Sequence, residues 1–326
     1  MIKDTHFLQS PTWESYQTLE GSKTFRIHGE TYSCLAILNT TPVGNYLFCP
    51  YGPSLSPIND ASLTAATKAL TLLAKEQNAF FIRIEPPYPN LETPLNSLGY
   101  QKSHHINPEA TWVIDLTQPE TDLLKNMRKT NVQYWRSHAK KGLTIRTSKN
   151  PEDITILTSL LHNVAKKDKF IPQTETHLKN QLKSGFATLY IAELDPKVAE
   201  VTEVASDSSN DKIPLAASLV YDNGDTRFYA HAASSDAYRK ISAGTVLLVQ
   251  MILDAKTAGA SSFDFWGITT SKDPKHPWYG FTKFKQSFGG SLVPYSGTWD
   301  LPINKPKYHL YRLIRQTNRT LRKLHR

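Results

Sequence analysis

Residues 261–290 have the sequence SSFDFWGITTSKDPKHPWYGFTKFKQSFGG, in which a predicted strand ends around Asp264 and Trp266. Functional side chains often gather where a strand ends. After an aromatic turn around Tyr279, phenylalanines recur at helical spacing on both sides of Lys285. The segment therefore predicts a strand, a turn and a helix that carries a lysine among aromatic rings.

In that helix, Phe284 directly precedes Lys285. Aromatic residues spaced three to four apart often belong to an ordinary core, and this alternative stays open for Phe284. A lysine among aromatic side chains either extends to solvent or holds an anion, such as a phosphate or the oxyanion of an acyl transfer. The residues alone leave both interpretations of Lys285 open.

Further towards the N-terminus, residues 229–244 read YAHAASSDAYRKISAG. Tyr229 and His231 are expected on one face of a strand, because side chains alternate with a period of two. Arg239, Ser242 and Gly244 have the spacing of the R-x-x-G-x-G loop that holds the CoA pyrophosphate in GNAT acetyltransferases, with Ser242 in place of the first glycine. A CoA site is therefore one possibility, and His231 also fits a structural strand histidine.

Predicted strands and helices alternate through two halves of similar length. Glu120 and Asp122 favour the start of a helix that Gly142 would end. The expected strands are 32–38, 46–49, 79–84, 111–116, 187–193, 215–221, 226–231 and 261–266, and the expected helices are 61–76, 151–166, 175–183 and 244–258. The pattern predicts two duplicated α/β domains.

The length of 326 residues and a hydrophobic content of 39% allow a full core. Only Cys34 and Cys49 are present, which argues against a disulfide framework or a cysteine zinc site, and we expect no metal and no cofactor. No signal-peptide pattern and no apolar window of about 18 residues is found, so we expect the protein in the cytoplasm. We also expect it to be a monomer. Residues 196–211 predict a solvated loop.

Two segments without acidic residues, 125–146 with +7 and 304–326 with +8, outweigh a charge of −6 on the rest of the chain and give the net charge of +9. The second segment is a predicted amphipathic helix. Its apolar stripe comprises Leu310, Ile314, Thr317, Leu321 and Leu324, and its basic stripe comprises Arg312, Arg315, Arg319, Arg322 and Arg326. Three interpretations stay open: contact with tRNA phosphates, peripheral contact with the inner membrane surface, or a surface helix docked by its leucines.

Several short motifs occur in an order that resembles the Fem family of non-ribosomal peptidyl transferases, over nearly the whole chain. They are FLQSPTW at 7–13, YGP at 51–53, IRIEP at 82–86, IDL at 114–116, the Tyr229/Ala232/Ser234 strand exit, DFWGI at 264–268, and FK at 284–285 followed by FGG at 288–290. The resemblance implies two tandem GNAT-like domains. We expect the first at 1–148, completed by the helix 303–326, and the second at 149–302.

The resemblance also implies an activity: transfer of an amino acid from aminoacyl-tRNA to the stem peptide of a peptidoglycan precursor, either lipid II or UDP-MurNAc-pentapeptide. Phe284 and Lys285 match the family's Phe-Lys pair at the tRNA acceptor end, and Glu85 stands where some members carry a carboxylate proposed to help deprotonate the amine. Substrate contacts are further expected from Tyr51, Arg83, Tyr229, His231, Tyr238, Arg239, Asp264, Trp266 and Tyr279, with His231 replacing a family tyrosine.

This chain departs from the family at the lysine and the arginine that contact the precursor diphosphate. Tyr16, Gln17, Pro172 and Gln173 stand near those positions. A CoA-dependent N-acyltransferase is the alternative enzyme, favoured by the loop 239–244. A nucleic-acid-binding module without catalysis would rest on charge alone.

Overall fold

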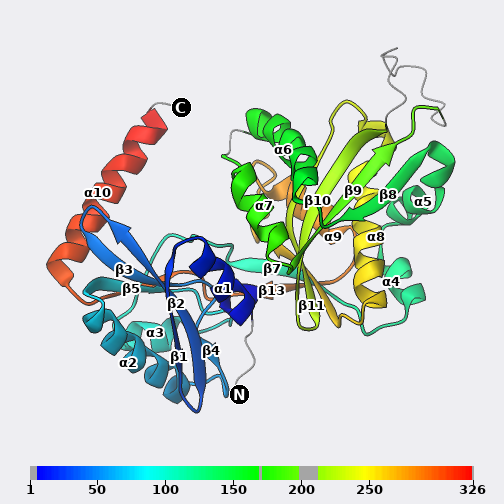
Figure 1. The fold of residues 1–326 in the computed structure, drawn as a ribbon. Coiled ribbons are helices and arrows are strands. Elements are labelled where there is room, and N and C mark those ends of the chain that lie inside the picture. Colours follow the sequence, from blue (N-terminus) through cyan, green and yellow to red (C-terminus); the bar gives the residue numbers. More distant parts are fainter. Residues whose placement is uncertain (1–5, 169–170, 198–211, 325–326) are drawn as a thin grey trace. The chain divides into compact units, whose positions relative to one another are not determined.

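The computed structural model describes residues 6–168, 171–197 and 212–324, which form two compact units (Figure 1). Unit 1 comprises Met1–Ala110 and Pro294–Arg326, and unit 2 comprises Thr111–Val293. These limits differ from the expected boundaries at 148/149 and 302/303. The reason is that residues 111–148 contribute strands to the sheet of unit 2 and helices that pack on it.

Unit 1 contains a seven-stranded mixed sheet with a helix on each face. The helix α2 (Asp60–Glu76) packs on one face, where Ile82 and Ile84 point, and α10 (Lys305–Leu324) packs on the other, where Phe81 points. The short helices α1 (Pro11–Leu19) and α3 (Glu92–Ser97) complete the unit. The strand order is β1 (Lys23–His28), β2 (Tyr32–Thr41), β3 (Gly44–Cys49), β5 (Ala79–Ile84), β14 (Trp299–Pro302) and β6 (Gln101–Lys102), with β4 (Ser54–Leu55) beside β2.

Unit 2 contains a second seven-stranded mixed sheet. Figure 1 shows α8 (Ala243–Thr257) with α4 (Glu120–Asn126) and α5 (Lys129–Ser137) on one side, and α6 (Ile154–Asp168) with α7 (Glu175–Lys183) on the other. The short helix α9 (Tyr279–Gln286) follows the last long strand. The strand order is β13 (Ser291–Pro294), β7 (Ala110–Asp115), β12 (Ser262–Gly267), β11 (Thr226–Ser234), β10 (Ile213–Asn223), β9 (Ala187–Leu194) and β8 (Leu143–Ser148).

The two sheets repeat one pattern. In unit 1, antiparallel β2 and β3 lead through α2 to β5, which lies parallel to β3 and antiparallel to β14. In unit 2, antiparallel β10 and β11 lead through α8 to β12, which lies parallel to β11 and antiparallel to β7. The prediction of two α/β domains of duplicated fold is confirmed, and each domain has a mixed sheet flanked by helices.

Most predicted elements are present, and the basic segment is the clearest exception. It was expected as one helix but forms α4 and α5, separated at Met127 and Arg128. The Arg128 N–H donates to the Ser287 carbonyl, so a contact distant in sequence breaks the helix. Gly142 adopts the expected left-handed conformation, with φ of 73°. The strands β1 and β14 were not predicted.

Some expectations at the chain's polar segments fall outside the described residues. Most of the loop 196–211 is among these, as is Arg326 of the basic stripe. Among the parts of the chain that the structure describes, no helix has both the length and the apolar character needed to cross a bilayer.

Candidate active site

The parallel strands β11 and β12 stop pairing part of the way along unit 2. Their register ends where Phe228 lies opposite Asp264. Beyond that pair, β11 continues to Ser234 and β12 to Gly267 without pairing with each other. The backbone groups beyond the last pair then need other hydrogen-bond partners. Residues of the 261–290 segment meet at this opening of the sheet.

Lys285 enters the opening from α9 and is only 2% exposed, so the interpretation that it extends to solvent is wrong. Its Nζ donates to the carbonyls of Phe265 and Gly267, each at 2.7 Å, and lies 3.8 Å from the centre of the Phe281 ring. Both carbonyls lie past the last β11–β12 pair. Burial lowers the pKa of Lys285 to about 7, against an opposing effect of Asp264, so charged and neutral forms coexist at neutral pH.

Asp264 is buried and fixes the irregular end of β12. Its carboxylate accepts hydrogen bonds from the Thr111 hydroxyl and from the Trp266 N–H, the latter at 2.6 Å. Trp266 has φ of 62°, a left-handed conformation that is strained for a bulky residue. Burial raises the pKa of Asp264 to about 6. These contacts set the geometry of the strand end that Lys285 also holds.

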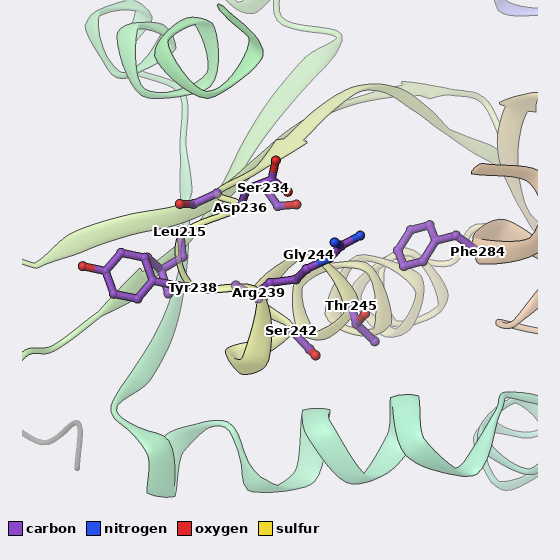
Figure 2. Close-up of a pocket in the computed structure, with 11 residues that line it drawn as sticks. Leu215, Ser234, Asp236, Tyr238, Arg239, Ser242, Gly244, Thr245 and Phe284 are labelled. Atoms are coloured by element: carbon purple, nitrogen blue, oxygen red, sulfur yellow. The ribbon is translucent and has the colours of Figure 1, made fainter. Parts of the chain in front are cut away.

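A pocket of about 290 Å³ opens where β11 ends and α8 begins (Figure 2). Exposed Arg239 extends along the start of α8 towards Phe284 of α9 in Figure 2. Ser242 precedes the helix in a left-handed conformation with φ of 57°, and its side chain does not cap the helix. The lining comprises Leu215, Ser234, Ser235, Asp236, Tyr238, Arg239, Ser242, Ala243, Gly244, Thr245 and Phe284. A helix N-terminus next to an arginine favours a negatively charged group.

Tyr229 and His231 lie on opposite faces of the sheet, so the prediction that they share a face is wrong. The register shifts between Leu219, which faces His231, and Val220, which faces Tyr229. This bulge at Ala230 reverses the alternation of side chains. Tyr229 therefore packs in the core beneath α8, with its ring 6.0 Å from Lys285 Nζ.

His231 belongs to a hydrogen-bonded chain on the face of α7. The Tyr221 hydroxyl donates to Gln181 Oε1 at 2.6 Å, and His231 Nε2 lies 2.9 Å from the same hydroxyl oxygen. Because the tyrosine proton is used on Gln181, His231 Nε2–H is the donor. Burial lowers the pKa of His231 to about 4, so the ring is neutral at pH 7. These contacts favour the structural interpretation of His231.

In unit 1, Glu85 is buried just past the end of β5. Its Oε1 accepts from the N–H groups of Ile106 and Asn107 and from the Thr298 hydroxyl, and its Oε2 accepts from Asn107 Nδ2 at 2.6 Å. Four donors thus converge on this carboxylate. Tyr51, nearby, donates from its hydroxyl to the Pro108 carbonyl at 3.2 Å. The contacts tie the segment 106–108 to the strand end.

Arg83, an expected substrate contact, is instead part of a buried ion pair in unit 1. Its Nε and Nη2 donate to the two oxygens of Asp300 at 2.6 and 2.7 Å, and both residues are at most 2% exposed. The Tyr308 hydroxyl of α10 also donates to Asp300. Arg83 thus joins β5, β14 and α10. Sequence position alone did not show that Asp300 would be its partner.

Of the other expected contacts, Tyr238 and Arg239 line the pocket, whereas Trp266 and Tyr279 do not. Trp266 packs edge-on against Tyr221 and Phe228, and Tyr279 begins α9 beneath Lys283. Sequence reasoning missed Thr111, because a threonine at a strand start carries no distinctive pattern. It also missed Asp236 and Thr245, which line the pocket. Both lie close to the CoA-like loop 239–244 in the sequence, and this proximity could have indicated them.

A family model described as the FemAB family matches residues 172–316, which include the whole pocket, Asp264 and Lys285. The lipid II:glycine glycyltransferase of Staphylococcus saprophyticus is 22% identical, covering 94% of this chain and 91% of its own length. The Staphylococcus aureus protein of that name is also 22% identical, covering 81% and 78%.

Among solved structures, the crystal structure of FemX shares the fold, with a TM-score of 0.81, 20% identity and 94% of each chain covered. Its agreement extends through both units. The chain therefore matches the FemAB family model over residues 172–316, is similar to lipid II:glycine glycyltransferases over most of its length, and shares the fold of FemX.

Proposed function

We propose that this protein is an aminoacyltransferase that moves an amino acid from aminoacyl-tRNA to the stem peptide of a lipid-linked peptidoglycan precursor. The proposal rests on the match to the FemAB family model, because the matched residues 172–316 include the lining of the pocket at α8 and buried Lys285. The named relatives are lipid II:glycine glycyltransferases. Glycine and lipid II are therefore the first substrates to test.

The reaction needs little covalent chemistry from the protein. The stem-peptide amine attacks the ester carbonyl carbon, a C–N bond forms, the C–O bond to the ribose breaks, and the ribose oxygen takes up a proton lost by the amine. The ester is already activated, so alignment and stabilisation of the developing oxyanion supply most of the rate. One well-placed cation and a rigid binding surface would meet this need.

Lys285 is the cation that we propose for this role. Two of its protons are directed to carbonyls of β12, which fixes the ammonium group beside the strand end. Its lowered pKa follows from a dry environment, in which a charge acts more strongly on a nearby oxyanion than it does in water. Only the protonated form carries that charge. Asp264 supports the role by raising the pKa of Lys285.

The pocket is our candidate for the acceptor end of the tRNA. Arg239 and the N-terminal end of α8 suit a phosphate, and the half-buried ring of Phe284 can stack on a base. Unit 2 also carries exposed cations that suit further tRNA phosphates. These are Lys125, Arg128, Lys129, Arg136, Lys140 and Lys141.

Glu85 is a weaker candidate for the group that accepts the amine proton. The four hydrogen bonds to its carboxylate favour a role in positioning the 106–108 segment. Since a base needs an accessible lone pair, the proton is better accepted by the ribose oxygen or by another group of the substrates.

The proposal is tested by incubating the protein with glycyl-, alanyl- or seryl-tRNA and either lipid II or UDP-MurNAc-pentapeptide, followed by mass spectrometry of the precursor. We expect the mass of one amino acid to be added to lipid II, and the gain to vanish when the tRNA is deacylated beforehand. No mass gain with any pairing would refute the proposal.

A CoA-dependent N-acyltransferase is the second candidate, because Arg239, Ser242 and Gly244 of the CoA-like loop all line the pocket. Adding CoA or acetyl-CoA would then raise the melting temperature, since a ligand that binds only the folded state stabilises it. An unchanged melting temperature with saturating CoA, together with transfer from charged tRNA, would eliminate this candidate.

A further inference from the structure

The helix α10 is attached to unit 1 by tyrosines. Tyr308 and Tyr311 are buried against Phe80 and Phe81, and the Tyr308 hydroxyl donates to Asp300 at 3.0 Å. The sequence had left open a helix docked by its leucines, and this alternative is wrong for the described part of α10. The tyrosines occupy the docked side, so the leucines must point elsewhere.

Three exposed apolar side chains of α10, in the part of the helix whose side chains the structure describes, point away from the sheet. Leu310 is 51%, Leu313 63% and Ile314 39% exposed. At about 100° per residue, Leu310 and Leu313 lie on the side of the helix opposite to Tyr308 and Tyr311, and Ile314 lies at the flank next to Leu310. Every residue from 312 to 317 is exposed, and Figure 1 shows α10 continuing beyond the sheet of unit 1. Large apolar side chains gathered on one exposed helix face indicate a binding surface.

Basic side chains border this apolar surface. Lys305 and Lys307 are exposed, and Lys307 precedes Leu310 by one helical turn. Arg312 lies on the docked side, where it donates to Gln101 Oε1 at 3.3 Å. The segment 304–326 carries a charge of +8 and contains no acidic residue. An apolar stripe with cations at its margins and a large helical amphipathicity is the pattern of helices that lie in the interface of an anionic membrane.

We propose that α10 binds the surface of an anionic lipid bilayer, with Leu310, Leu313 and Ile314 inserted and the neighbouring cations at the lipid phosphates. Nucleic acid would engage the cations but leave the leucines in water. Two copies of the segment, each with a charge of +8, would repel one another. A bilayer with anionic headgroups can bind both the apolar and the basic side chains of the helix, because it offers an apolar phase beneath negatively charged phosphates.

The test is flotation of the whole protein with vesicles of phosphatidylcholine, alone or with about one third phosphatidylglycerol. The variant Leu310→Ser/Leu313→Ser/Ile314→Ser removes the apolar surface without touching the docked tyrosines. The matched control is Leu19→Ser/Ile58→Ser/Leu72→Ser, which changes three exposed apolar side chains elsewhere in unit 1. The assay contains no tRNA and no precursor, so its result is independent of the proposed transferase activity.

We expect the wild type and the control to float with the anionic vesicles, and the α10 variant to bind at least about tenfold more weakly. Binding to pure phosphatidylcholine should be much weaker for all three. The proposal would be overturned if the wild type failed to float at low salt, or if the α10 variant floated as well as the control. It would equally be overturned if the α10 substitutions abolished tRNA binding or dissociated a dimer while leaving flotation unchanged.

Discussion

In unit 1 the parallel strands β3 and β5 stay paired to their ends, whereas in unit 2 β11 and β12 separate after Phe228 and Asp264. The unit 1 pairing reaches Cys49 opposite Ile84, and the next N–H, of Glu85, still donates to the Gly52 carbonyl at 3.1 Å. In unit 2, the carbonyls past the last pair are bonded by the side chain of Lys285 instead.

The comparison shows how one strand order can serve two purposes. Where the parallel strands stay paired, the polar side chains at their ends hold neighbouring segments, as Glu85 does. Where they separate, a pocket forms beside the helix N-terminus and a lysine becomes buried. We therefore assign the chemistry of transfer to unit 2 and a supporting role to the strand end of unit 1.

The largest effect is expected from Lys285→Met, which removes the lysine contacts at the separated strand end of unit 2. It removes the proposed oxyanion contact and leaves two buried carbonyls without donors. We expect kcat/KM for transfer to fall by about 10²- to 10³-fold, and the free energy of unfolding to fall by about 1–3 kcal/mol. Single-turnover transfer and urea denaturation measure the two losses.

Lys283→Met is the control for that variant, because Lys283 is an exposed lysine of the same helix. It should retain near-normal transfer and stability. A Lys285→Met protein that transferred as fast as this control would contradict the assignment of Lys285.

Glu85→Gln should have a smaller effect, and one on stability more than on turnover. The amide would present a donor where Asn107 Nδ2 now donates to the carboxylate at 2.6 Å. We expect the free energy of unfolding to drop by about 1–3 kcal/mol, as for other buried polar groups that lose a partner. The pH dependence of kcat should stay unchanged. A large loss of kcat with normal stability would instead make Glu85 the proton acceptor and remove the contrast between the units.

Asp264→Asn should have the smallest effect, a displacement of the pH profile. Burial lowers the pKa of Lys285, and the negative charge of Asp264 partly opposes this effect, so that the resulting pKa is about 7. If protonated Lys285 is required, activity falls as the pH rises through that value. Without the negative charge the pKa of Lys285 drops further, so the alkaline limb of single-turnover rate should move to lower pH. A shift to higher pH, or none, would show that Asp264 does not act on the lysine.

Local patterns predicted much of the fold. The strand β5 and the helix α7 have the predicted limits, because period-two and period-3.6 patterns report the burial of neighbouring residues. Contacts between distant residues could not be predicted in this way. The strand β14 is short and is stabilised by pairing with β5, and the break between α4 and α5 depends on Ser287.

The site was predicted only in part, because its contacts also join residues that are distant in sequence. Lys285 was identified by its position in a motif, but its partners are backbone carbonyls, which no side-chain pattern reveals. The bulge at Ala230 separated Tyr229 from His231 although the sequence shows no glycine or proline there. The need for glycine at Gly290 of the FGG motif also comes from a contact distant in sequence, since a Cβ at this position would lie 2.5 Å from the Val113 carbonyl oxygen.

Hydrogen–deuterium exchange with a tRNA minihelix that carries glycine through a stable 3′ amide tests the central claim most directly. If unit 2 receives the donor, bound minihelix should slow exchange at residues 239–246 and 281–286, around the pocket and α9, and leave residues 85 and 106–108 unchanged. Slowed exchange confined to the unit 1 strand end, with the pocket of unit 2 unaffected, would contradict the account.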